Sequence, residues 1–318
     1  MIEIQFHNRR AVQAENEHVR LTVTVEGGHV AEILHKPSGV NPLWIPPWPS
    51  IEPSSYSATH SAIRHPEYGD NAESKLLAGI MGHNLCLDLF GAPSDEEARA
   101  GISVHGEASI VPYELSVHES ELTARCIMPI AQIAFERRIR LTPNRILFSE
   151  TVENLSALDR PIAWTQHVTL GPPFMEYGVT EFRAPVVKSH TLNEGFSTHL
   201  MDPHNDRAYF FARSPKSDVL FGYVWNRIDF PWLGIWEERK GRTHAPWNGR
   251  TVTRGMEFGA SPLPESRRQM IDRNSLFGVP AYRWLPAKSK LRADYYAFIT
   301  AAKSIPETLE ELEVHVPA

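Results

Sequence analysis

The sequence predicts an all-β fold class, made of antiparallel sheets with few and short helices. Hydrophobic residues alternate with polar ones in many short segments, and turn residues separate these segments. The 25 prolines and 19 glycines also interrupt long helices. Regular alternation of strands with helices is missing, and no flexible linker or internal repeat divides the chain. We therefore expect a single antiparallel β domain that covers residues 1–318.

The first clear strand is expected at residues 19–25, where valine and leucine alternate with arginine and threonine until Gly27-Gly28 ends the run. Turn signals such as Thr142-Pro143-Asn144 separate the later strands, as expected of antiparallel neighbours. These later strand-like segments cover residues 108–117, 122–128, 133–141, 146–154, 162–170, 209–212, 219–225 and 295–299.

Residues 40–70 form a different kind of segment, with six prolines and several aromatic side chains. The segment is too broken for a helix and too apolar for a flexible linker, so we expect an ordered loop over a sheet edge or a cleft mouth. Two short helices are expected elsewhere. One follows Pro93-Ser94 at residues 95–99, and the other lies near the C-terminus, where Ser304 and Glu307 form a capping pattern.

Composition argues against several classes of protein. The formal net charge is −6 and no basic block occurs, so nucleic-acid binding is not expected. The N-terminus lacks a basic segment followed by an apolar core, and no run of about 18 apolar residues is present. We expect a cytoplasmic protein without membrane association. Cys86 and Cys126 lie far apart in apolar stretches, which predicts buried free thiols.

Three polar segments within strand-like sequence are candidates for proton-transfer chemistry. Each one alone has an ordinary explanation, because most histidines in β proteins are structural and most strand glutamates face water. Two imidazoles and one carboxylate in a single cleft could, however, exchange protons near neutral pH. Apolar neighbours would raise the pKa of the glutamate toward that of a general base. The segments are Val104-His105-Gly106-Glu107, Thr165-Gln166-His167-Val168-Thr169-Leu170-Gly171 and Gly255-Met256-Glu257-Phe258-Gly259.

These segments resemble motifs of the aldose 1-epimerases, the galactose mutarotase-like family. Asn154-Leu155-Ser156, Pro161, His167 and Pro173-Phe174 follow the order of one family pattern. His105-Gly106 is similar to the family's earlier His-Gly motif, and Gly255-Met256-Glu257 is similar to the late segment that carries its glutamate base. The likeness runs from about residue 28 to the C-terminus, through motifs that are individually short.

The resemblance implies a β-supersandwich and an enzyme that interconverts the α and β anomers of a sugar. In this scheme Glu257 takes the proton of the C1 hydroxyl while His167 gives a proton to the ring oxygen, and the ring opens. Rotation about C1–C2 and reversal of the transfers yield the other anomer. His105 would bind near the ring oxygen. We expect these residues to line one concave pocket, with Glu257 facing the two histidines across a sugar-sized gap.

The sequence departs from the family pattern at two substrate-binding positions. The family's Gly-Arg motif is missing upstream of the first histidine, and Lys75 or His83 is the candidate substitute, although neither reproduces a planar guanidinium. A substrate-binding aspartate is also expected before the late glutamate. Asp202 is the first candidate for this role, and Asp206 and Asp229 compete with it.

Trp232, Trp236 and Trp247 precede the late glutamate, and aromatic rings stack on the apolar faces of sugars. Most tryptophans are core residues, and Trp236 is our candidate for contact with a ligand. Motifs typical of metal or nucleotide sites are missing, so we expect neither a metal nor a cofactor.

The preferred function is an aldose 1-epimerase-like isomerase that acts on a small-molecule carbohydrate, as a monomer or homodimer. Two alternatives stay open: a non-catalytic sugar-binding or regulatory protein on the same fold, and a lyase or glycoside hydrolase on a related sandwich. Paired carboxylates would favour hydrolysis, whereas one carboxylate beside two histidines would not. The scarcity of arginine and lysine in the motif segments argues against a phosphorylated sugar.

Overall fold

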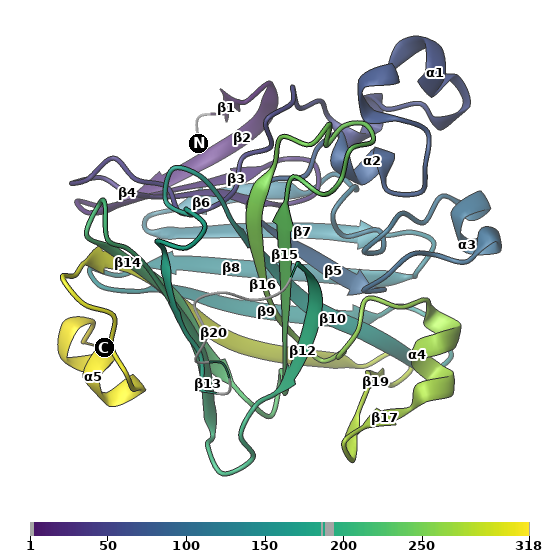
Figure 1. The fold of residues 1–318 in the computed structure, drawn as a ribbon. Coiled ribbons are helices and arrows are strands. Elements are labelled where there is room, and N and C mark those ends of the chain that lie inside the picture. Colours follow the sequence, from purple (N-terminus) through teal and green to yellow (C-terminus); the bar gives the residue numbers. More distant parts are fainter. Residues whose placement is uncertain (1–2, 186, 188–193, 318) are drawn as a thin grey trace.

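The computed structural model describes residues 3–185, 187 and 194–317, and two large sheets dominate it (Figure 1). Every ladder between the described strands is antiparallel, as the sequence predicts. The first sheet has ten strands. In spatial order they are β1 (Glu3–Phe6), β2 (Arg9–Glu15), β3 (Val19–Thr24), β4 (Val30–His35), β5 (His83–Asp88), β10 (Arg160–Leu170), β16 (Val252–Gly259), β15 (Trp232–Arg239) and β12 (Gly195–Leu200), with β19 (Arg283–Leu285) paired to β10.

The second sheet has eight strands and packs against the first. In spatial order they are β11 (Glu181–Arg183), β13 (Arg207–Ser214), β14 (Val219–Asn226), β20 (Lys290–Ala301), β9 (Ile146–Asn154), β8 (Ile133–Leu141), β7 (Glu121–Met128) and β6 (Glu114–His118). A separate hairpin joins β17 (Ser275–Leu276) to β18 (Val279–Pro280).

The main core lies between the two sheets because strand residues alternate between two faces. Phe258 of the first sheet contacts Tyr295 of the second, with ring centroids 5.4 Å apart. A buried polar group also crosses this core: Arg137 donates to Glu150 at 2.7 Å, and the Trp164 indole donates to the same carboxylate at 2.9 Å. A charge at this depth is tolerated because its partners satisfy it.

The other face of the ten-stranded sheet is covered by loops and short helices. Trp44, Trp48, Tyr56 and Tyr68 from the proline-rich segment form a second apolar cluster with Trp247. This confirms the ordered covering segment that the sequence predicts. Figure 1 shows α1 to α4 on one side of the molecule and α5 on the opposite side, near the C-terminus. The helical elements are η1 (Pro53–Ser55), η2 (Ala58–His60), α1 (Ser61–Arg64), η3 (Pro66–Tyr68), α2 (Ser74–Leu77), α3 (Asp95–Ala100), α4 (Arg267–Arg273) and α5 (Leu309–His315).

Local predictions differ in accuracy. α3 begins with a capping box between Ser94 and Glu97, close to the expected residues 95–99. The C-terminal helix is wrongly placed, because Thr308 rather than Ser304 caps it. Residues 108–112 are turn and bridge rather than strand. Cys86 and Cys126 are buried and free, as expected. None of the described helices is long and apolar enough to span a membrane.

Candidate active site

The central pair of the site comes from two adjacent strands of the ten-stranded sheet. β10 pairs with β16 in a register that sets His167 directly opposite Glu257. Their neighbours Val168 and Phe258 belong to the core, so the period of two in a strand turns His167 and Glu257 to the other face. There His167 Nε2 lies 3.1 Å from Glu257 Oε1.

The second histidine reaches the same place from the loop between α3 and β6. The ring centroid of His105 lies 4.9 Å from that of His167. His105 Nδ1 lies 2.6 Å from the carbonyl oxygen of Phe90. A carbonyl can only accept a hydrogen bond, so Nδ1 carries the hydrogen and Nε2 is left as the acceptor. The backbone φ of His105 is +68°, in the left-handed region, so the loop holds this residue in an unusual conformation.

Gly106 allows this loop to approach β5. Its φ is +81°, and it forms a parallel bridge with Leu87. A Cβ at this position would lie far inside van der Waals contact with the Leu87 carbonyl oxygen. Any larger residue therefore needs both a left-handed backbone and a shift of the neighbouring strand.

We expect Gly106→Ala to lower the free energy of unfolding by more than about 2 kcal/mol, which sums left-handed strain and the clash. Gly278→Ala is the matched control, because Gly278 has φ +78° and a Cβ added there would meet no other atom within 4 Å. Thermal melting of both variants checks this expectation. Equal losses would show that the close approach of Gly106 to Leu87 does not matter for stability.

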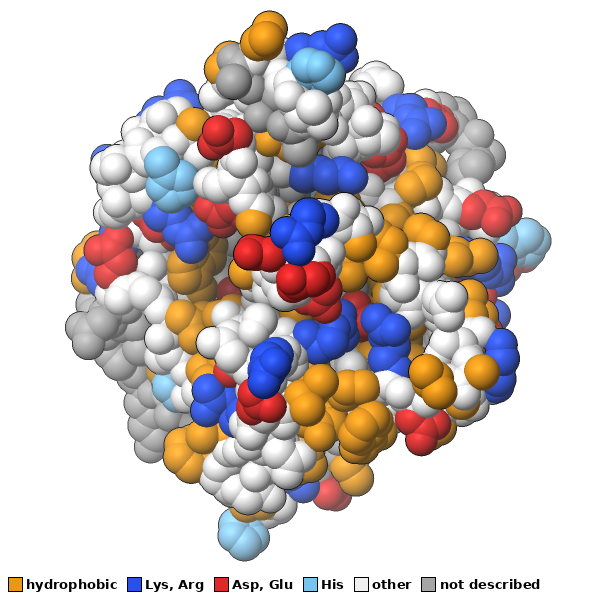
Figure 2. Space-filling model, turned by 90° about the vertical axis from the view of Figure 1, so that its right-hand side faces the viewer, with side chains coloured by type: hydrophobic (Ala, Val, Ile, Leu, Met, Phe, Trp, Pro, Cys, Tyr) orange, Lys and Arg blue, Asp and Glu red, His pale blue; other side chains and the backbone are white. Residues whose placement is uncertain are grey.

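His105, His167 and Glu257 line one cavity of about 450 Å³. Hydrophobic side chains make up most of its walls, among them Trp44, Trp236 and Trp247. The face with α1 to α4 is shown in Figure 2, where hydrophobic side chains lie in a hollow between protruding charged groups. The three predicted proton-transfer residues therefore share one concave, partly apolar site.

The rim of the cavity carries an ion-paired arginine. Arg242 lies in the loop between β15 and β16, and its guanidinium donates to Glu73 at 3.3 Å. It also lies 3.6 Å from Glu238 and packs over the rings of Trp236 and Trp247, with distances of 5.1 and 4.8 Å to the ring centroids. The ion pair between Arg242 and Glu73 joins the loop after β15 to the start of α2, and these two segments are far apart in the sequence.

Burial controls the proton affinities of the reacting groups. Loss of water raises the pKa of Glu257 to about 8, and nearby Arg242 opposes this rise. Burial lowers the pKa of His105 to about 4 and lowers that of His167 well below its usual value. At neutral pH the contact between His167 and Glu257 therefore holds one proton, and the directions of the two pKa shifts place it on Glu257.

Solved structures with a similar fold provide the comparison. A Klebsiella pneumoniae protein provisionally named an aldose 1-epimerase aligns with a TM-score of 0.67 and 14% identity, over 93% of this chain and 80% of that chain. A galactose mutarotase related enzyme from Lactobacillus acidophilus aligns with a TM-score of 0.61 and 11% identity, over 93% of this chain and 99% of that chain. This chain has the galactose mutarotase-like fold. The predicted β-supersandwich is thereby confirmed.

A galactose mutarotase-like protein from Clostridium acetobutylicum shares the fold, with a TM-score of 0.59 and 12% identity, over 94% of this chain and 98% of that chain. No protein-family model matches the sequence, and no curated protein matches it. At these identities the comparisons establish the galactose mutarotase-like fold, and the site has to be judged from its own residues.

Of the four residues proposed to bind substrate, the structure brings only Trp236 to the cavity of this mutarotase-like fold. The predicted placement of His83 in the site is wrong. His83 of β5 lies opposite Val168 of β10, and directly opposite residues share a face of the sheet, so His83 faces the core as Val168 does. There His83 Nδ1 lies 2.9 Å from the Tyr223 hydroxyl. Lys75 is in α2, whose Leu76 and Leu77 line the cavity while Lys75 does not.

The expected aspartate does not reach the cavity either. Asp202 accepts hydrogen bonds from the backbone of His204 and the side chain of Asn205, which stabilises the turn after β12. Neither Asp206 nor Asp229 lines the cavity. The carboxylates among its described lining residues are Glu73 and Glu257, so the proposed site contains no aspartate.

Two charged segments near the predicted motifs have partners of their own. Glu107 does not orient His105, because its carboxylate accepts from the backbone of Ile130 and Ala131. The charged run at residues 237–240 is not a solvated cluster: Glu237 and Glu238 are buried, and Glu237 pairs with Arg254 at 2.5 Å. Arg242, which the sequence analysis did not propose as a site residue, follows this run by two positions.

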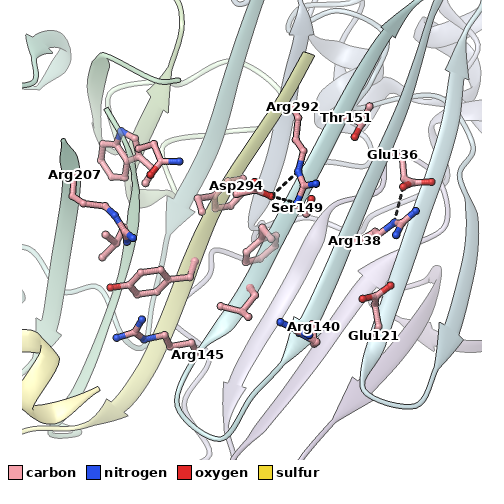
Figure 3. Close-up of a pocket in the computed structure, with 17 residues that line it drawn as sticks. Glu121, Glu136, Arg138, Arg140, Arg145, Ser149, Thr151, Arg207, Arg292 and Asp294 are labelled. Atoms are coloured by element: carbon pink, nitrogen blue, oxygen red, sulfur yellow. Dashed lines mark hydrogen bonds and ion pairs between the residues drawn. The ribbon is translucent and has the colours of Figure 1, made fainter. Parts of the chain in front are cut away.

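The predicted gap between Glu257 and the histidines is also wrong, since Glu257 touches His167 directly. No group of described side chains has the composition and spacing of a metal site. A second concavity, of about 600 Å³, lies on the eight-stranded sheet (Figure 3). None of its described lining residues is a histidine, and Arg138–Glu136 and Arg292–Asp294 pairs of this kind are typical of a solvated sheet face.

Proposed function

We propose that this protein interconverts the α and β anomers of a free aldose by general acid and base catalysis. The observation that carries the proposal is the direct contact between His167 and Glu257 in a buried cavity beside His105. Ring opening needs an acid at the ring oxygen and a base at the C1 hydroxyl. Both oxygens are bonded to C1, so the acid and the base have to be neighbours, as His167 and Glu257 are.

The reaction can proceed with the single proton that this pair holds, once that proton has moved from Glu257 to His167 across their 3.1 Å contact. With the proton on His167, the Glu257 carboxylate takes the proton of the C1 hydroxyl as a C1–O double bond forms. The bond between C1 and the ring oxygen breaks, its electron pair goes to the ring oxygen, and this oxygen takes the proton of His167. The open-chain aldehyde then rotates about C1–C2, and the same transfers run backward to give the other anomer.

His105 has a supporting part in this proposal. Its Nδ1 hydrogen is committed to the Phe90 carbonyl, so its Nε2 can accept a hydrogen bond from a sugar hydroxyl. Thr169 lies 3.0 Å from His167 Nδ1 and holds the orientation of that ring. Orientation of this kind keeps the acid aligned with the ring oxygen.

The pH dependence should follow the one-proton pair. Because the pKa of Glu257 is raised to about 8, the pair keeps its proton below that pH and loses it above. Because the pKa values of both histidines are lowered, the site binds a second proton only in acid. The pKa of His105, about 4, marks the pH at which this begins. We expect the enzyme-dependent rate to stay level from about pH 5 to 7 and to fall above about pH 8.

Measurement of this profile requires subtraction of the base-catalysed background at each pH. A rate that keeps rising above pH 9 would contradict the one-proton pair.

The test of the function is exchange spectroscopy by NMR with a panel of dissolved aldoses, in which enzyme transfers magnetisation between the two anomeric protons. Acceleration over buffer for any sugar of the panel supports the proposal. A protein that binds sugars without accelerating exchange is a carbohydrate-binding protein instead. Glycoside hydrolysis has less support, because the second carboxylate of the cavity, Glu73, is bonded to Arg242 and to His244.

A further inference from the structure

One wall of the cavity is apolar. Leu76, Leu77 and Ile80 come from α2 and the turn after it, and Trp44 and Trp247 pack beside them in one buried cluster. This cluster is continuous with the packed interior under the proline-rich segment, so its side chains have little freedom to move away. A ligand that fills the cavity has to contact this surface.

Few side chains are left in the cavity to bind the hydroxyls of a sugar. Besides the proton-transfer residues and Thr169, the polar groups among the described lining side chains are those of Asn71, Glu73 and Arg242 and the indole N–H groups of the three tryptophans, of which that of Trp247 is buried without a hydrogen-bond partner. The Asn71 oxygen already accepts from the Glu73 amide and the Ser74 hydroxyl. The Glu73 carboxylate accepts from Arg242 and faces His244. A sugar hydroxyl pressed against the aliphatic side chains of Leu77 and Ile80 would lose its bonds to water without replacement.

The rim also opposes an anionic substituent. Arg242 is the cationic residue among the described lining side chains, and it lies between the carboxylates of Glu73 and Glu238. A phosphate or carboxylate on the ligand would have to compete with both of these groups for the guanidinium. An uncharged ligand leaves the arrangement intact.

We infer that the substrate is a neutral aldose that lacks a hydroxyl where it meets the apolar wall, such as a 6-deoxy sugar. The inference rests on the proposed anomer interconversion and adds the substrate class. C6 is the position that suits this wall, because it lies outside the pyranose ring and its hydroxyl takes no part in ring opening. A methyl group there packs against Leu77 and Ile80, whereas a hydroxymethyl group leaves a polar atom unsatisfied.

The experiment compares sugars that differ at C6 alone: D-galactose with D-fucose, D-glucose with 6-deoxy-D-glucose, and D-glucose with its 6-phosphate. We expect kcat/KM for anomer exchange to be at least tenfold higher for each 6-deoxy sugar than for its parent. Tenfold corresponds to about 1.4 kcal/mol. We expect the 6-phosphate to be at least tenfold poorer than glucose. Parents that exchange as fast as their 6-deoxy partners would overturn the inference and leave the proposed function standing.

Two variants test separately the apolar wall and the ion pair at the rim. Ile80→Thr adds a hydroxyl to the wall and should bring the ratio of 6-deoxy sugar to parent closer to one. Ile80→Val is the control, because valine has the size and shape of threonine without the hydroxyl, and it should keep the ratio. Glu73→Gln frees one side of Arg242, so the ratio of 6-phosphate to glucose should rise several-fold. Unchanged ratios in both Ile80→Thr and Glu73→Gln would overturn the inference.

An error in the proposed function would give a different result from an error in the substrate class. If no sugar exchanges faster with enzyme than in buffer, the proposed function is wrong, and saturation-transfer NMR then decides the ligand class by binding. Stronger binding of the 6-deoxy sugars would keep the inference for a binding protein. Equal or weaker binding than that of their parents would end it.

Discussion

Glu257→Gln should lower the rate of anomer interconversion by about a hundredfold or more, because it removes the proton acceptor and keeps the size of the side chain. The effect should appear in kcat, with little change in the affinity for the sugar. Glutamine can still donate a hydrogen bond to His167 Nε2, which lies 3.1 Å from the carboxylate. Exchange NMR with saturating sugar measures the effect.

The thermal stability of Glu257→Gln at different pH values tests the raised pKa of Glu257 separately. The folded-state pKa of Glu257 is about 8 and its ordinary value is 4.5, so the folded protein binds a proton that the unfolded chain has released. Wild-type stability therefore falls as the pH rises from about 4.5 to about 8, and a neutral glutamine escapes this loss. We expect the Tm of Glu257→Gln to exceed that of wild type at pH 8.5 and to approach it near pH 4.5. A variant with lower Tm at pH 8.5 would contradict the raised pKa.

His167→Asn should also reduce exchange by about a hundredfold, because asparagine cannot give a proton to the ring oxygen. The loss should again lie in kcat. His199→Asn is the matched control, since His199 is a half-buried histidine of β12 that bonds to Ser197 and does not line the cavity. Exchange by this control should equal that of wild type. An active His167→Asn enzyme would show that another group protonates the ring oxygen.

The sequence predicted the strands well where alternation was clean and the boundaries carried turn residues. β8 and β9 span residues 133–141 and 146–154, as predicted. β15 was missed because its second half, Glu237 to Arg239, is charged and does not alternate between hydrophobic and polar residues. In the structure the two carboxylates are buried and pair with arginines: Glu238 with Arg242 in the following loop, and Glu237 with Arg254 of β16. The fold brings these partners together, so local polarity gave the wrong answer.

The structure brings some of the predicted site residues together and leaves others apart. His105, His167 and Glu257 lie together, as predicted from three short polar motifs that resemble those of the aldose 1-epimerases. His83 was wrongly included because the face of a strand depends on register, and its register with Val168 turns it to the core. Arg242 was missed because a loop brings it to the cavity, and loop geometry leaves no periodic pattern in the sequence.

The predicted gap between acid and base failed for a chemical reason as well as a geometric one. Motifs far apart in the sequence suggested opposite walls of a cleft, but β10 and β16 are adjacent strands. In the proposed reaction the two oxygens that exchange protons share one carbon atom, so adjacent strands suit it better than opposite walls.

The most direct test of the proposed proton transfer is the exchange of magnetisation between the two anomeric protons of D-fucose at pH 7, measured with wild type, with Glu257→Gln and with buffer alone. We expect rapid exchange with wild type and a rate about a hundredfold lower with the variant, with both proteins folded and sugar bound. Equal exchange with the two proteins, or no exchange by a wild type that binds the sugar, would contradict it.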